Sequence, residues 1–132
     1  MRAVLADTGP LYASFDPDDS HHERARRELG RLAQERRGVM VAYPTLLESH
    51  RLVLQRLGRK PASAWLDEVL RKGALVNPSE QDYLEGVMML SALPDQAITL
   101  FDATLAVLAT RLKLEVWTYD HRFDVMRAKV WR

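Results

Sequence analysis

The chain has 132 residues, enough for one globular domain and too few for two domains with independent cores. With 47% hydrophobic and 28% charged residues it is not a disordered chain, and no apolar stretch approaches the roughly 20 residues that a membrane span requires. A net charge of +1 means that any nucleic-acid partner must be held by a local patch or through bound metal. Cysteine is absent, which excludes disulfides, thiolate zinc sites and cysteine nucleophiles. Asp7 comes too early for a signal peptide, so we expect a cytoplasmic location.

Uninterrupted apolar runs predict buried strands, and periodic apolar positions predict helices between them. Strands are predicted at 2–6, 39–42, 74–76 and 114–118, with a short fifth strand at 129–131. Helices are predicted from 17–20 to Gly38, from Pro44 to Gly58, from about Pro61 to Arg71, from 77–79 through Met88, and from Phe101 to Leu112. Ser20 and Glu23 have the spacing of a capping box, which marks the start of the first helix. The Asp-Thr-Gly-Pro sequence at 7–10 predicts a turn.

Apolar strands that alternate with helices are typical of a parallel sheet covered on both faces. The sequence contains no internal repeat, low-complexity tract or linker. The predicted fold class is therefore α/β. We expect a single domain over residues 1–132, with a central parallel sheet of four or five strands flanked by helices on both faces.

Four carboxylates come just after predicted strands. Asp7 directly follows the first strand and Asp120 the fourth, while Glu48 and Asp102 lie in the first turns of helices. Ligands of an open parallel sheet bind outside the carboxyl ends of its strands, so these four side chains are expected to meet at one edge. Like charges held together need cations, and an all-oxygen ligand set suits Mg²⁺ or Mn²⁺. Such an ion activates water and stabilises a phosphoryl transition state, which indicates phosphodiester hydrolysis.

Each acid taken singly also has a structural explanation. Asp7 and Asp120 can cap turns or short helices, and Glu48 can face water. Asp102 belongs to an almost wholly apolar helix, where a carboxylate in the first turn gains from the helix dipole. Their common placement at strand ends nevertheless favours a shared site.

Two basic groups are candidates for gripping nucleic acid. The first, downstream of Glu48, consists of Arg51, Arg56, Arg59 and Lys60. The second is interleaved with Phe123 and Trp131 and consists of Arg122, Arg127, Lys129 and Arg132. Phosphate contacts and aromatic stacking are what single-stranded nucleic acid requires. A solvated helix face or a partner interface explains the same residues equally well.

Four segments, in order and over nearly the whole chain, resemble a known family. They are LADTGPL at 5–11, LE at 47–48, the stretch from LPD at 93–95 to FDA at 101–103, and TYDHRF at 118–123. Together they resemble the PIN domains, specifically the short VapC-type toxin ribonucleases of bacterial toxin–antitoxin pairs.

The resemblance implies a metal-dependent endoribonuclease that hydrolyses single-stranded RNA. It implies that one or two Mg²⁺ or Mn²⁺ ions are held by Asp7, Glu48, Asp102 and Asp120. Thr8 and Thr118 would then orient carboxylates or metal-bound waters. Asp124, one helical turn beyond Asp120, could replace or assist the fourth ligand, whereas Asp95 matches a turn or cap position. The resemblance further implies a homodimer and a small antitoxin protein as partner, and no membrane.

Two other classes remain open at this point. A phosphate-binding receiver-like module also gathers carboxylates at strand ends, but it needs adjacent acids after the first strand and a lysine after a late one, and neither is evident. A catalytically silent PIN-fold module would bind RNA or protein without cutting. The presence of acids at all four positions argues against this second alternative.

Overall fold

The structure is a computed structural model that describes residues 2–132. Strands and helices follow one another in this order: β1 Ala3–Ala6, α1 Thr8–Ala13, α2 His22–Gln34, β2 Gly38–Ala42, α3 Tyr43–Leu57, α4 Arg59–Lys72, β3 Ala74–Val76, α5 Glu80–Ala92, α6 Leu100–Leu112, β4 Glu115–Trp117 and α7 Arg122–Val125. Within this described part of the chain, no helix is long and apolar enough to cross a membrane.

The four strands form one parallel sheet in the order β3-β2-β1-β4. In the central strand, Leu5 pairs with Met40 on one side and with Val116 on the other. The predicted α/β fold with four parallel strands is thus confirmed. The fifth strand is not formed, because Val130 makes only an isolated parallel bridge to Val116. The next residue, Trp131, packs instead into the core on the α2 side of the sheet.

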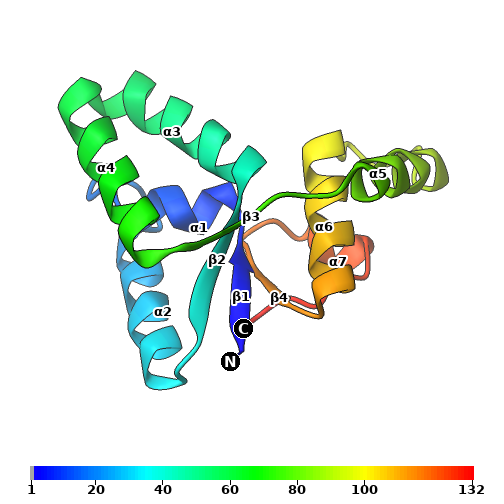
Figure 1. The fold of residues 1–132 in the computed structure, drawn as a ribbon, viewed down its shortest axis with the longest axis horizontal. Helices are drawn as coiled ribbons and strands as arrows, with labels where there is room; N and C mark the ends of the chain where they lie inside the picture. Colours follow the sequence, from blue (N-terminus) through cyan, green and yellow to red (C-terminus); the bar gives the residue numbers. More distant parts are fainter. Residues whose placement is uncertain (1) are drawn as a thin grey trace.

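Helices cover both faces of the sheet (Figure 1). One core lies between the sheet and α1 to α4, and the other lies between the sheet and α5 to α7. Successive strand residues alternate between the two cores: Val4 and Ala6 belong to the first and Leu5 to the second. Such alternation follows from the two-residue period of a β-strand and explains why the strands are apolar throughout.

Two predictions of local structure were wrong. Residues 7–10 do not form a simple turn, because helix α1 begins at Thr8 and places Pro10 in its first turn, where a backbone N–H has no helical partner to lose. Ser20 and Glu23 do not form a capping box, because α2 begins at His22 and its N-cap residue, His21, makes no side-chain capping bond. The Asp19 carboxylate instead accepts a hydrogen bond from the His21 backbone N–H at 2.8 Å, in a turn that precedes the helix.

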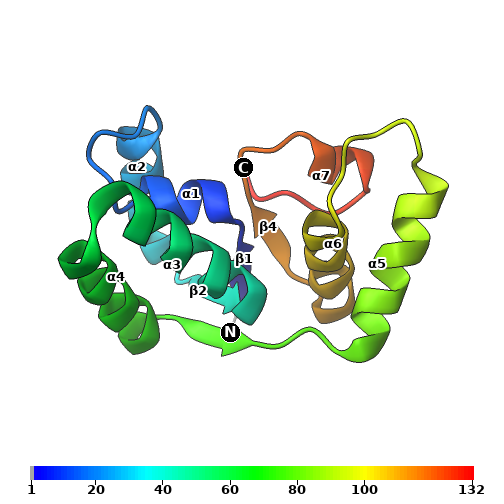
Figure 2. The same ribbon diagram turned by 90° about the horizontal axis from the view of Figure 1, so that it is seen from above.

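The carboxyl ends of the strands are followed at once by elements that carry polar groups. Helix α1 starts one residue after β1 ends at Ala6, and α3 starts directly after β2. A loop leads from β4 to the short helix α7, and Figure 2 shows α6 packed beside β4 on the side of the sheet opposite α3. This arrangement brings residues from four distant parts of the sequence to one rim.

Candidate active site

Asp7 lies at the junction of β1 and α1 and is 8% exposed. Its Oδ1 accepts a hydrogen bond from the Thr8 backbone N–H at 2.8 Å, which makes it the N-cap of α1. Its Oδ2 accepts a hydrogen bond from the Thr118 hydroxyl at 2.8 Å. Burial raises the pKa of Asp7 to about 6, against the lowering effect of these two hydrogen bonds, and the nearby Asp102 and Asp120 carboxylates add to the rise. The acidic side chains of this region therefore repel one another.

Glu48 is brought to Asp7 by the short α1 helix. It lies in the second turn of α3 and is exposed, and its Oε2 accepts a hydrogen bond from the Thr8 hydroxyl at 2.6 Å. Thr8 thus joins two of the predicted acids, with its backbone N–H on Asp7 and its hydroxyl on Glu48.

Asp102 is the third residue of α6 and forms a capping box with Thr99. Its backbone N–H donates to the Thr99 hydroxyl at 3.1 Å, while its Oδ2 accepts from the Thr99 N–H at 3.4 Å. The long second bond leaves most of the carboxylate's hydrogen-bonding capacity free. Asp102 can therefore cap helix α6 and bind a ligand in the cavity at the same time.

Asp120 is held at the start of the loop between β4 and α7. Its backbone N–H donates to the Thr118 hydroxyl at 3.0 Å, and its Oδ1 accepts from the Arg122 backbone N–H at 2.9 Å. The Arg122 guanidinium lies 3.6 Å from Asp120 Oδ2. Thr118 therefore contacts two of the predicted acids, Asp7 and Asp120.

All four acids line one open cavity of about 530 Å³. Its lining residues are Asp7, Thr8, Gly9, Glu48, Thr99, Phe101, Asp102, Tyr119, Asp120, His121 and Arg122. Of the eight basic residues in the two predicted nucleic-acid-binding groups, only Arg122 is among them. Asp124 lies on α7 outside this lining, and its carboxylate pairs with Arg132 at 2.7 Å. The structure thus brings together the four acids and Arg122.

The basic residues of the first group lie along α3 and α4. Arg51 is exposed one turn beyond Glu48, while Arg59 and Lys60 are exposed at the start of α4. The Arg56 guanidinium lies over the Tyr12 ring, 4.9 Å from its centre, and therefore makes a contact within the protein.

The PIN domain family profile matches residues 4–129, nearly the whole chain. The chain belongs to the PIN domain family. Among curated proteins, a search finds no match.

Solved structures show the same fold for this PIN domain at low sequence identity. VapC20 of Mycobacterium tuberculosis, a sarcin–ricin loop cleaving toxin, is 18% identical with a TM-score of 0.83, over 98% of this chain and 99% of that one. VapBC2 of Rickettsia felis, bound to a DNA fragment from its promoter, is 14% identical with a TM-score of 0.78, over 98% and 97% of the two chains. FitAcB of Neisseria gonorrhoeae is 19% identical with a TM-score of 0.71, over 98% and 96%.

The donor set of this PIN domain fits a hard divalent cation. Among the described lining residues, the charged groups are four carboxylates and one guanidinium, with His121 as the only imidazole. Such oxygen ligands match Mg²⁺ or Mn²⁺. Burial is the main cause of the raised pKa of Asp7, and the Asp102 and Asp120 carboxylates add to it, as like charges near one another do. In residues 2–132 no three His, Asp or Glu side chains are already gathered around one point that a metal could share. Glu48, Asp102 and Asp120 are each turned toward a hydrogen-bond donor instead.

Sequence reasoning did not single out two polar residues of this cavity. Thr99 stands three positions before Asp102, a capping-box spacing that was visible in the sequence. Tyr119 lies between Thr118 and Asp120, and no pattern in the sequence indicates that it lines the cavity. Its position depends on a contact with the distant helix α2.

Proposed function

We propose that this PIN domain is a metal-dependent endoribonuclease that hydrolyses single-stranded RNA, and that it acts as the toxin of a toxin–antitoxin pair in the cytoplasm. The observation that carries the proposal is the convergence of Asp7, Glu48, Asp102 and Asp120 on one open cavity. The fold similarity to VapC20, a toxin that cleaves an RNA loop, supports the substrate class. An open, acid-lined cavity can admit a flexible strand whose phosphates are met by cations.

The four acids would hold one or two Mg²⁺ or Mn²⁺ ions. When bound, the metal lowers the pKa of a water and stabilises the extra charge on the phosphoryl group under attack. Asp7 is ionised above its pKa of about 6 and can then act as a ligand near neutral pH. Thr8 and Thr118 orient the Glu48 and Asp7 carboxylates through their hydroxyl groups.

Arg122 supplies positive charge at the same rim. Its guanidinium lies 3.6 Å from one oxygen of Asp120, and its own backbone N–H holds the other. A side chain in this position can contact a substrate phosphate and keep Asp120 oriented at the same time. We therefore assign Arg122, rather than the α3 and α4 basic residues, to the scissile region.

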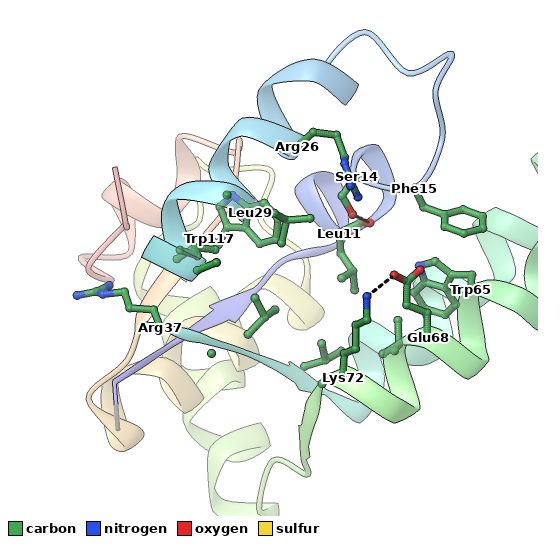
Figure 3. A pocket seen from close by; sticks show the side chains of 18 of the residues that line it. Leu11, Ser14, Phe15, Arg26, Leu29, Arg37, Trp65, Glu68, Lys72 and Trp117 are labelled. Atoms are coloured by element: carbon green, nitrogen blue, oxygen red, sulfur yellow. Dashed lines mark hydrogen bonds and ion pairs between the residues drawn. The ribbon is translucent and has the colours of Figure 1, made fainter. Parts of the chain in front are cut away.

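The antitoxin is proposed to occupy an apolar groove (Figure 3) that shares no lining residue with the acid-lined cavity. This groove has a volume of about 880 Å³ and lies between α1, α2 and α4, with Leu11, Leu29 and Trp65 among its walls. Its described charged lining residues are Arg26, Arg37, Lys72 and Glu68; Lys72 pairs with Glu68, and Arg37 pairs with Glu115 outside the groove. An apolar peptide segment with acidic residues complements both the walls and the charge.

A second copy of the chain is the other proposed partner. Helix α5 carries an exposed apolar stripe formed by Tyr83, Leu84, Val87 and Met88, of which Met88 is 68% exposed. The opposite side of α5 is fixed to α6, where the buried Asp82 accepts two hydrogen bonds from Arg111, at 2.8 and 2.7 Å. The exposed stripe is thus held outward, where a copy of itself would cover it.

Cleavage of a short single-stranded RNA, assayed with Mg²⁺, with Mn²⁺ and with EDTA, tests the proposed activity. We expect cleavage with either metal and none with EDTA or with Asp7→Asn. Asp124→Asn is the matched control, because this carboxylate is outside the cavity, and it should cut like the unmodified protein. Cleavage that survives EDTA would overturn the metal mechanism, and loss of activity in Asp124→Asn would move the fourth ligand from Asp120 to Asp124.

A further inference from the structure

Glu28 on α2 makes an unusual pair of contacts for a residue that does not line the acidic cavity. Its Oε1 accepts hydrogen bonds from the Trp117 indole N–H at 3.0 Å and from the Tyr119 hydroxyl at 2.6 Å. Its other oxygen faces Arg24 at 3.4 Å, and its side chain is only 15% exposed. One carboxylate oxygen therefore fixes two side chains at the end of β4.

The residue between those two side chains is Thr118. Its hydroxyl donates to Asp7 at 2.8 Å and accepts from the Asp120 N–H at 3.0 Å. The Trp117 carbonyl also accepts a hydrogen bond from the Asp7 N–H at 2.9 Å. Three consecutive residues thus connect Glu28 to two of the four acids. If Glu28 Oε1 is removed, the Trp117 indole, 1% exposed, is left without this acceptor.

We propose that Glu28 is a positioning residue of the metal site. It acts through Trp117 and Tyr119, which hold Thr118 in place. There the Thr118 hydroxyl donates to the Asp7 carboxylate and accepts from the Asp120 backbone N–H. The inference rests on the proposed metal-dependent function, because it concerns how tightly the same acids bind the ion. Residues that hydrogen-bond to metal ligands and fix their orientation influence metal affinity although they do not contact the metal.

The C-cap residue of α2, Glu35, seven residues beyond Glu28, provides a matched control. Glu35 accepts a hydrogen bond from the Trp131 indole at 3.2 Å and pairs with Arg31, four residues earlier, as Glu28 pairs with Arg24. Trp131 lies beyond α7 and does not contact the acids. Both glutamates thus accept from an indole N–H and pair with an arginine four residues earlier. Only Glu28 also accepts from Tyr119, beside the acids, whereas Glu35 also pairs with Arg37.

The experiment measures Mn²⁺ affinity of the purified protein by electron paramagnetic resonance of free Mn²⁺, with melting temperature and RNA cleavage on the same samples. Glu28→Ala should weaken Mn²⁺ binding about 3- to 10-fold, at or below the low end of the range for residues that contact ligands directly. Glu28→Gln should stay within about twofold, because its amide oxygen can take the place of Oε1 for both donors. Glu35→Ala should lower the melting temperature without changing Mn²⁺ affinity.

Tyr119→Phe is the second variant, since it removes one donor and leaves α2 intact, and it should weaken Mn²⁺ binding in the same direction even if Glu28→Ala does not fold. Unchanged Mn²⁺ affinity in Tyr119→Phe and in folded Glu28→Ala, or an equal loss in Glu35→Ala, would assign Glu28 a purely structural role. That outcome leaves the proposed function standing so long as Asp7→Asn abolishes Mn²⁺ binding. An unmodified protein that binds no Mn²⁺ would overturn both proposals.

Discussion

Asp7 stabilises the start of a helix and at the same time belongs to a cluster of like charges. Its pKa in the folded protein is about 6 against 3.8 for a free aspartate side chain, with burial as the main cause. The folded state therefore holds this proton more tightly than the unfolded chain does. The contribution of Asp7 to stability is fully present below pH 3.8 and is lost as the pH rises through about 6.

This shift predicts a pH-dependent effect of Asp7→Asn in metal-free protein. The amide does not ionise, so the variant should gain stability relative to the unmodified protein as pH rises. Between pH 4.5 and 7.5 the difference in unfolding free energy should grow by about 2 kcal/mol. Urea unfolding in EDTA at the two pH values measures it. If the difference in unfolding free energy is the same at both pH values, the pKa of Asp7 is not raised in the folded protein.

Asp102→Asn separates catalysis from stability at the third acid. We expect nearly complete loss of RNA cleavage, while the metal-free protein melts at the same temperature or slightly higher. Relief of repulsion is offset by a lost helix-dipole interaction worth roughly 0.3–1 kcal/mol. The capping box should persist, because the Asp102 N–H still donates to Thr99 and an asparagine oxygen can accept in return. A less stable variant that still cuts RNA would remove Asp102 from the site.

At the residue scale, the acids and the two threonines that contact them, Thr8 and Thr118, could be predicted, whereas the role of Glu28 could not. Each acid follows a strand, and the geometry of parallel sheets alone brings strand ends to one rim. The contacts of Glu28 with Trp117 and Tyr119 span 89 and 91 residues and depend on how α2 lies against β4. No local sequence pattern indicates these contacts, because a glutamate on the polar face of an amphipathic helix has the same sequence context whether it faces water or bonds a distant strand.

At the scale of elements, the strands were predictable because both faces of the sheet are buried and each strand is an apolar run. The six-residue helix α1 was not, because Gly9 and Pro10 are typical of turns and the helix is short. The N-cap of this helix is Asp7, and nothing in the sequence distinguishes a capping aspartate from a metal ligand. Here the residue serves as a cap and also lines the acidic cavity.

Helix α2 offers a test of the proposed antitoxin groove through Gly30. This glycine lines the groove, and a Cβ placed on it would meet no atom within 4 Å. Gly30→Ala should therefore stabilise the free protein by up to about 1 kcal/mol, because glycine is unfavourable inside a helix. Gly30→Phe should also fold, with its ring projecting into the groove.

Co-expression with a candidate antitoxin, a small protein whose gene adjoins the gene of this chain, is the measurement for this pair. Gly30→Phe should fail to co-purify with that protein, whereas Gly30→Ala should retain it. RNA cleavage by the isolated Gly30→Phe variant should be unchanged, because the acids lie in a different cavity. Equal retention of the partner by both variants would place the antitoxin elsewhere on the molecule.

At the scale of the whole molecule, α5 is the helix furthest from the sheet on its side (Figure 1). Met88→Glu places a charge in the middle of its exposed apolar stripe, and we expect the protein to change from dimer to monomer by light scattering at micromolar concentration. Leu70→Glu on α4 is the matched control, since Leu70 is also exposed, at 53%, but lies outside the stripe. Melting should change little in the isolated monomer. A dimer that survives Met88→Glu, or an unmodified protein that is monomeric, would refute this interface.

The single bridge between Val130 and Val116 protects the edge of the sheet against aggregation. β4 is an edge strand, and the outward backbone groups of Val116 are satisfied by Lys129 and Trp131 at 2.8 and 2.9 Å. An uncovered strand edge is a template for pairing with another chain. Deletion of residues 129–132 would thus bare both hydrogen-bonding groups of Val116 and open the core beside Trp131. Such a truncated protein should assemble into insoluble aggregates during expression, and purification tags are better placed at the other end of the chain.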